Sequence, residues 1–129
     1  MIKVNVTKEA NYPVSSPKLK AALRVFFTKK GIVSDSQVDV AVVGEEKMKT
    51  LGKKYLNEGG TPHNVLSFVE TEVKGDFVNP PDGVIRLGGI VLCFPVIREE
   101  AKREGKLIDE KAVELAEHAA LHLLGEHHD

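Results

Sequence analysis

Hydrophobic and polar residues repeat with regular periods along most of this 129-residue chain, and the periods predict where its strands lie. Residues 2–6 and 38–43 alternate with period two, as expected for strands that bury one face. Residues 65–69 form a short apolar run. Residues 84–94 form a longer, nearly continuous run, which is typical of a central strand covered on both faces. The glycine pair 88–89 interrupts this run and predicts a bulge or the close approach of another group.

Helical spacing of apolar residues, together with start and stop signals, predicts four helices. They cover residues 17–30, 45–56, 95–105 and 110–124. Ser16 precedes a proline and is the predicted N-cap of the first helix, and Asp109 is the predicted N-cap of the last. The order of elements is strand, helix, strand, helix, strand, strand, helix, helix. It predicts an α+β fold, a mixed sheet of about four strands with helices packed on it.

Composition and charge narrow the class of protein. A chain of this length, with 42% hydrophobic and 29% charged residues, is expected to form a single domain spanning residues 1–129 with a real core. The formal net charge of −1 gives no global basic field. The single cysteine, Cys93, excludes an intrachain disulfide and is expected to be a small buried side chain. With no membrane-length apolar run and no signal peptide, the sequence predicts a cytoplasmic protein without a membrane partner.

The candidate chemistry lies at the C-terminal end, where four of the five histidines occur within residues 118–129. On a helix, His118 and His122 project from one face one turn apart, so both rings can reach one metal ion. Gly125 is expected to end the helix in the left-handed conformation, which lets His127 or His128 approach the same ion. Three neutral nitrogen ligands leave a fourth position open for water, which is typical of a catalytic zinc site.

A His-x-x-x-His spacing alone has a second interpretation, since two histidines at helical spacing also occur on an ordinary polar helix face. The third histidine after a helix-ending glycine favours the metal site. The helix of residues 45–56 carries Lys47, Lys49, Lys53 and Lys54 and is the most basic segment. It too has an ordinary interpretation, as a solvated face.

Three blocks of sequence resemble the YbeY family of zinc-dependent endoribonucleases, which act as ribosomal RNA maturation factors. Residues 118–128 read HAALHLLGEHH, where the family signature is HGxLHLxGYDH. Residues 62–68 read PHNVLSF, which is similar to the family's PT[DN]VLSF, and residues 87–93 read LGGIVLC, which is similar to LGDIVIC. The blocks occur in the same order, so the resemblance covers essentially the whole chain.

The resemblance implies one zinc ion per chain, bound by His118, His122 and His128, with His127 pointing elsewhere. It also implies cleavage of single-stranded RNA, with the zinc-bound water attacking a phosphodiester. The implied partners are ribosomal RNA and the small ribosomal subunit, and no DNA is expected. Ser67 is a candidate to bond to phosphate or to the metal-bound water, although a structural serine in a sheet is equally compatible with the pattern.

The chain departs from the family at three positions that bear on catalysis, one of which is His127, where the family has an aspartate before the last histidine. Leu56 stands where the family commonly has an arginine implicated in activity, and Gly89 stands where it has an aspartate. The candidate cations that could contact phosphate in place of the arginine are Lys53, Lys54 and Arg86. The missing arginine leaves open a non-catalytic alternative, a ribosome-assembly or RNA-binding protein with a structural zinc.

A zinc peptidase is the rival enzyme class. His-Glu-x-x-His proteases place their general base directly after the first histidine, and this chain has Ala119 there. Glu117 precedes the histidine and lies about 100° round the helix from it, which is a poor position for the same role.

Overall fold

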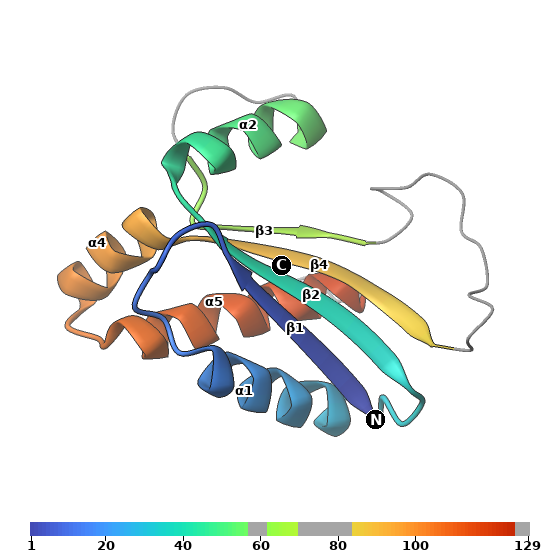
Figure 1. The fold of residues 1–129 in the computed structure, drawn as a ribbon. Helices are drawn as coiled ribbons and strands as arrows, with labels where there is room; N and C mark the ends of the chain where they lie inside the picture. Colours follow the sequence, from blue (N-terminus) through green and yellow to red (C-terminus); the bar gives the residue numbers. More distant parts are fainter. Residues whose placement is uncertain (57–61, 70–83, 126–129) are drawn as a thin grey trace.

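The computed structural model describes residues 1–56, 62–69 and 84–125. Within these ranges the chain forms one four-stranded sheet and helices that pack on it (Figure 1). The elements, in chain order, are β1 (Ile2–Lys8), α1 (Ser16–Lys29), β2 (Ser36–Val43), α2 (Glu45–Leu56), β3 (Val65–Phe68), β4 (Ile85–Cys93), α4 (Phe94–Glu104) and α5 (Ile108–Leu123). The predicted α+β class and the predicted mixed sheet are confirmed.

The sheet has the order β1-β2-β4-β3, with β1, β2 and β4 parallel and β3 antiparallel to β4. The long apolar run therefore lies inside the sheet, as expected. The short strand β3 lies at its edge, where one side of its backbone is not paired with another strand of the described chain.

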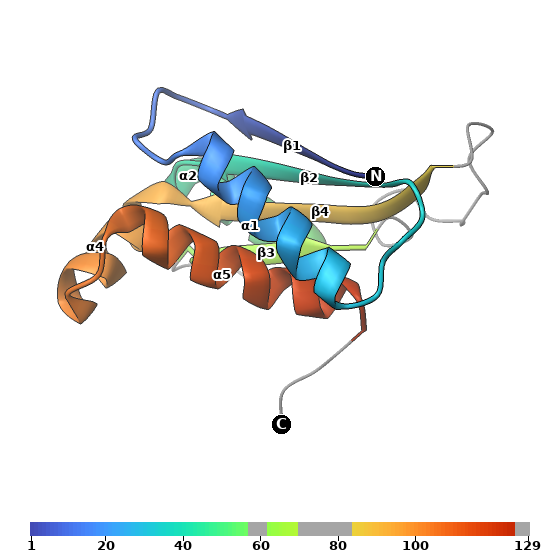
Figure 2. The ribbon, with the colours of Figure 1, turned by 90° about the horizontal axis from the view of Figure 1, so that it is seen from below.

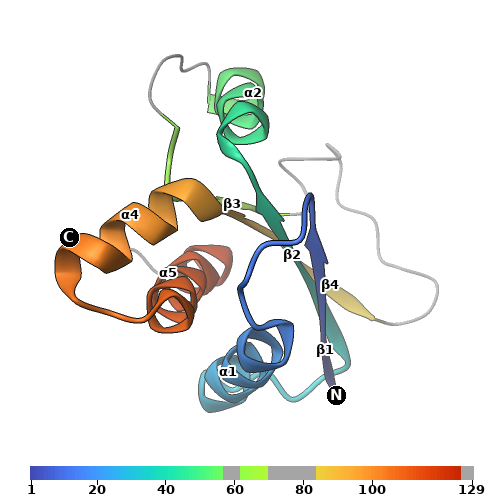
Figure 3. The ribbon, with the colours of Figure 1, turned by 60° about the vertical axis from the view of Figure 1, so that its left-hand side comes forward.

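Alternate residues of the strands point to different helices because side chains along a strand alternate between its two faces. Val38, Val40 and Val42 of β2 belong to the core that packs against α1 and α5. Val43 and Met48 belong to a second, smaller core beneath α2. Figures 2 and 3 show α1 and α5 side by side on one face of the sheet, with α2 on the other. None of the described helices has the length and apolar composition needed to span a membrane.

The glycine pair in β4 produces the predicted irregularity. The register between β2 and β4 shifts at Gln37/Val38, opposite residues 86 and 88. Gly88 has φ +131°, and a Cβ atom built on it would lie 2.3 Å from the Phe68 carbonyl oxygen and 2.9 Å from Leu123 Cδ2. Both expectations for this position, a bulge and a close approach, are confirmed.

Two of the predicted helix caps were wrong by one or two residues. Ser15, not Ser16, is the N-cap of α1, because its backbone is extended and its hydroxyl accepts a 3.2 Å hydrogen bond from the Lys18 N–H. Helix α5 begins earlier than expected, after Leu107, so Asp109 lies inside its first turn. There the Asp109 carboxylate accepts a 2.9 Å hydrogen bond from the Ser15 N–H, which joins the starts of two helices that are distant in sequence.

The two neighbouring glycines of β4 provide a matched test of this packing. Gly88→Ala should lower the free energy of unfolding by about 2 kcal/mol or more, because it combines positive-φ strain with a clash against backbone. Gly89→Ala should change it by less than about 1 kcal/mol, since its Cβ would meet only the Asp39 carbonyl oxygen at 3.8 Å. Urea denaturation of both variants checks the difference, and equal stabilities would contradict the proposed close approach at Gly88.

Candidate active site

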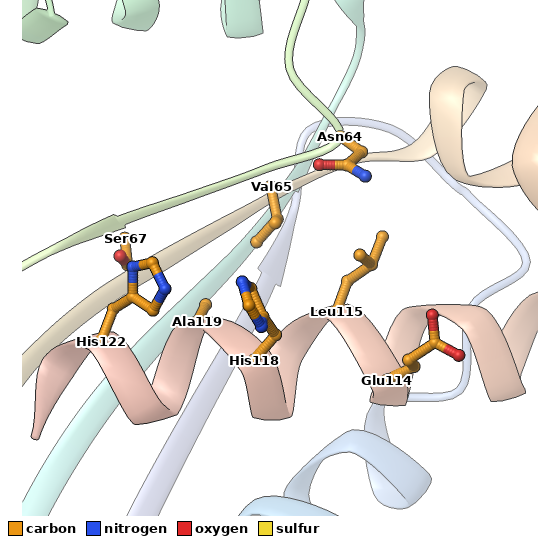
Figure 4. A pocket seen from close by; sticks show the side chains of 8 residues that line it. All are labelled: Asn64, Val65, Ser67, Glu114, Leu115, His118, Ala119 and His122. Atoms are coloured by element: carbon orange, nitrogen blue, oxygen red, sulfur yellow. The ribbon is translucent and has the colours of Figure 1, made fainter. Parts of the chain in front are cut away.

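A cavity of about 430 Å³ lies between the edge strand β3 and helix α5. Figure 4 shows the side chains that line it, which are Asn64, Val65 and Ser67 from the β3 segment and Glu114, Leu115, His118, Ala119 and His122 from α5. Two of the predicted metal ligands and the predicted serine are therefore brought together by elements about 50 residues apart in the sequence.

Helix α5 presents the histidines because its opposite stripe is buried. Ala112, Ala116 and Ala120 are fully buried against the sheet and α1, whereas His118 and His122 are exposed along the margin of the helix. The two rings lie one helical turn apart, with centroids 4.8 Å apart and planes tilted by 53°. Because alanine has little volume, the helix lies close to the sheet and the imidazoles stand at the level of β3.

This arrangement fits two of the ligands of a tetrahedral metal. Two imidazoles that bind one zinc ion at about 2.1 Å and at the tetrahedral angle have ring centroids on the order of 5 Å apart. The separation of the His118 and His122 rings is close to this value. Within residues 1–56, 62–69 and 84–125, no group of three histidine, cysteine or acidic side chains is placed to hold a metal. The predicted third ligand, His128, and its neighbour His127 lie outside the described residues. Gly125 has φ +79°, so the predicted left-handed turn after the helix is confirmed.

Ser67 faces α5 because of its register in the sheet. It pairs with Ile90 of β4, and Ile90 belongs to the core on the α5 side. Ser67 and His122 both line the cavity, and Figure 4 shows them toward the same end of it. A hydroxyl can donate and accept hydrogen bonds, so this side chain can contact either a phosphate oxygen or a water in the cavity.

The three predicted phosphate-binding cations do not line this cavity. Lys53 and Lys54 are exposed on the last turn of α2, which packs on the sheet face opposite α5. Arg86 pairs with Gln37 before the bulge, while its neighbour Leu87 packs against the α5-side core. Arg86 therefore points toward the opposite face of the sheet from the histidines.

Two polar residues that line the cavity, Asn64 and Glu114, were not among the site residues predicted from the sequence. The sequence contains a signal for each of these two residues. Asn64 lies in the block of residues 62–68, and Glu114 precedes His118 by four residues, which places it on the same helical face. In Figure 4 both lie at the end of the cavity away from His122.

Glu114 belongs to an ion-pair network that determines its charge. Its carboxylate contacts the Lys106 ammonium and accepts a 2.8 Å hydrogen bond from Lys111 Nζ, and these two cations lower the pKa of Glu114 to about 2. Lys111 is only 6% exposed and also donates to Glu104 at 3.0 Å and 3.1 Å. At neutral pH the Glu114 carboxylate is therefore ionised, and the ammonium groups of Lys106 and Lys111 balance its charge. Such a group is unsuited to act as a general acid or base.

Glu117 does not line the cavity, as its position on the helix predicted. Burial raises the pKa of its carboxyl, and the nearby Lys29 ammonium of α1 opposes that shift. With Ala119 directly after the first histidine, the described part of the site has no carboxylate in the position that a zinc peptidase requires.

The Glu114 network makes a prediction about acid stability. The folded pKa of about 2 is below the ordinary value of 4.5, so this carboxylate stabilises the fold above pH 4.5 and loses its contribution as the pH falls toward 2. Glu114→Gln should lower the unfolding free energy at pH 7 by about 1 kcal/mol or less, since solvent screens these partly exposed groups. The difference from wild type should disappear near pH 2. Urea denaturation at both pH values tests this, with Glu99→Gln on the exposed side of α4 as control; a pH-independent difference would contradict the ion-pair explanation.

The chain is similar to a known family of proteins over most of its length. The family model described as "Endoribonuclease YbeY" matches residues 4–129. An endoribonuclease YbeY from Cutibacterium acnes is 33% identical over 97% of this chain and 80% of its own length. One from Burkholderia ambifaria is 36% identical over 76% of this chain and 51% of its own length. The solution structure of TM1509 from Thermotoga maritima shares the fold, with a TM-score of 0.60 and 22% identity over 98% of this chain and 75% of that chain. The chain belongs to the endoribonuclease YbeY family.

Proposed function

We propose that this chain is a zinc-dependent endoribonuclease that cleaves single-stranded RNA and acts in ribosomal RNA processing and ribosome biogenesis. The observation that carries the proposal is the pair of side-by-side imidazoles of His118 and His122 in a cavity that also holds Ser67. The relatives that bear the name endoribonuclease support the reaction class. RNA, in particular that of the small ribosomal subunit, is the proposed substrate and partner.

The residues of the cavity have separable roles in this proposal. His118 and His122, with His128, would hold zinc, which when bound supplies a Lewis acid able to activate water at neutral pH and to neutralise phosphate charge. The Ser67 hydroxyl orients a phosphate oxygen by hydrogen bonding. Val65, Leu115 and Ala119 form the apolar part of the wall and limit the access of other water molecules.

The position of β3 supports a proposed path for the RNA strand. This strand is the sheet edge next to the cavity, and α2 packs on the side chains of Leu66 and Phe68 on its other face. A strand of RNA that leaves the cavity across this edge reaches α2, where Lys53 and Lys54 are exposed. Cations and metal would then contact different phosphates of one substrate, from opposite faces of the sheet.

The metal site is tested by single alanine substitutions. His118→Ala, His122→Ala and His128→Ala should each reduce zinc affinity by more than the roughly 10–100-fold that loss of an outer-shell partner causes, and should abolish RNA cleavage. His127→Ala is the matched control and should retain both zinc and activity. Zinc content by atomic absorption and cleavage of a labelled single-stranded RNA are the measurements. If His127→Ala loses zinc and His128→Ala retains it, the ligand assignment is wrong.

The proposed RNA path is tested by charge reversal on α2. Lys53→Glu combined with Lys54→Glu should weaken RNA binding and flatten the dependence of affinity on salt, because each lost phosphate contact removes the release of about one counterion. The control is Lys3→Glu combined with Lys8→Glu on β1, which makes the same change in net charge at the opposite edge of the sheet from β3. Fluorescence anisotropy over a range of salt concentrations measures both. Equal effects of the two double variants would show that α2 acts only through the overall charge.

A non-catalytic RNA-binding or ribosome-assembly protein with a structural zinc is the second candidate. It is favoured by one observation, that Lys53, Lys54 and Arg86 all lie outside the cavity while Leu56 occupies the position of the family's arginine. The cleavage assay separates the two candidates. Zinc-loaded protein that binds RNA but cleaves it no faster than metal-stripped protein would support the second.

A further inference from the structure

We infer that the side-chain carbonyl of Asn64 accepts a hydrogen bond from a ribose 2′-hydroxyl of the bound strand, and that this contact makes the site prefer RNA to DNA. Glu100 is the positioning residue that orients the amide. The inference rests on the proposed function, because it assigns a specificity-determining contact to the same cavity.

The amide of Asn64 has a fixed orientation. Its Nδ2 atom lies 3.0 Å from Oε1 and 3.3 Å from Oε2 of Glu100. A carboxylate only accepts hydrogen bonds, so the amide nitrogen must face Glu100 and the carbonyl oxygen must point away from it. In Figure 4 that oxygen points along the cavity, toward the side on which the histidines lie.

Hydrogen bonds fix both the main chain and the side chain of Asn64. The main-chain carbonyl of Asn64 accepts a 3.0 Å hydrogen bond from the Cys93 N–H at the end of β4. Glu100 is itself 20% exposed and lies 4.0 Å from the ammonium of buried Lys111. Reorienting the amide would leave the Glu100 carboxylate without this donor and place an oxygen against it. The acceptor is therefore preorganised before any ligand enters.

The chemistry of nucleic acids identifies what such an acceptor recognises. Phosphate oxygens and the sugar ring oxygen only accept hydrogen bonds, so they cannot pair with Asn64 Oδ1. Along the backbone, the 2′-hydroxyl is the group that can donate, and it is also the group that distinguishes RNA from DNA. Base amino and imino groups can also donate to Oδ1, so the test compares two base sequences as well as two sugars.

The test compares binding of two single-stranded oligonucleotides, one with ribose and one with 2′-fluoro-ribose, each made as oligo-U and as oligo-A, to zinc-loaded protein. The fluoro sugar keeps an RNA-like pucker but has no hydroxyl donor. Wild type should bind the ribose form about 2- to 10-fold more tightly, the value of one neutral hydrogen bond. Asn64→Leu should bind the two forms with equal affinity, so that the ratio of the two affinities falls to about one. Anisotropy measures the affinities, and a denaturing gel after each titration checks that the strand is intact.

The positioning role is tested in the same assay. Glu100→Ala should reduce the preference for ribose because the amide is then able to rotate, and Glu100→Gln should preserve most of it because its carbonyl still accepts from Nδ2. Glu99→Ala, at an exposed position beside it, should leave the preference unchanged. A merely structural role for Glu100 would change the affinity for both oligonucleotides together and leave their ratio unaltered.

The outcomes separate this inference from the proposed function. Wild-type protein that cleaves RNA but binds the two sugars equally would overturn the inference and leave the endoribonuclease proposal standing. A preference for ribose that persists in Asn64→Leu would also overturn the inference. So would a preference that occurs with oligo-U and not with oligo-A, because it would indicate recognition of the base. Protein that binds neither strand would contradict both.

Discussion

The close approach of α5 to the edge of the sheet is the constraint on which the rest of the site depends. The inner face of α5 carries fully buried alanines, and β4 has a glycine at position 88. Because these residues are small, α5 and the sheet can approach each other closely. Larger side chains there would move the helix outward by the thickness of their added methylene groups, because interiors are close-packed. The histidines would then no longer stand opposite the polar groups of β3. The depth of the cavity is therefore set by residues that carry no chemistry.

A second constraint is the burial of Lys111. A buried ammonium is costly unless it is paired, and here glutamates from α4 and α5 surround it, including Glu104 at 3.0 Å and Glu114 at 2.8 Å. Such clusters contribute little net stability compared with apolar packing, and this one links side chains of α4 and α5. In this chain the cluster joins the two last helices and, through Glu100, reaches the segment that leads into β3.

The elements could be predicted from the sequence because each has a clear period and most have a distinct end signal. The first helix cap was misplaced because Ser15 and Ser16 are equally good cap residues, and only the backbone conformation selects between them. The histidine pair could be predicted because its spacing lies within one helix. Arg86 could not be placed, because the bulge beside it changes which face of the sheet each residue meets. Asn64 gains its role from Glu100, a contact between segments 36 residues apart that no local pattern encodes.

The position of Gly89 has a consequence for the charge on the far face of the sheet. A side chain at this position would project onto the sheet face that carries Asp39, directly across from it on the neighbouring strand. An aspartate there would place two carboxylates opposite each other in the sheet, and like charges in a cross-strand pair repel. Here Asp39 instead accepts a 2.9 Å hydrogen bond from the Asn5 amide. In this chain the glycine thus avoids the cross-strand repulsion that an aspartate beside Asp39 would cause, on the side of the sheet away from the histidine cavity.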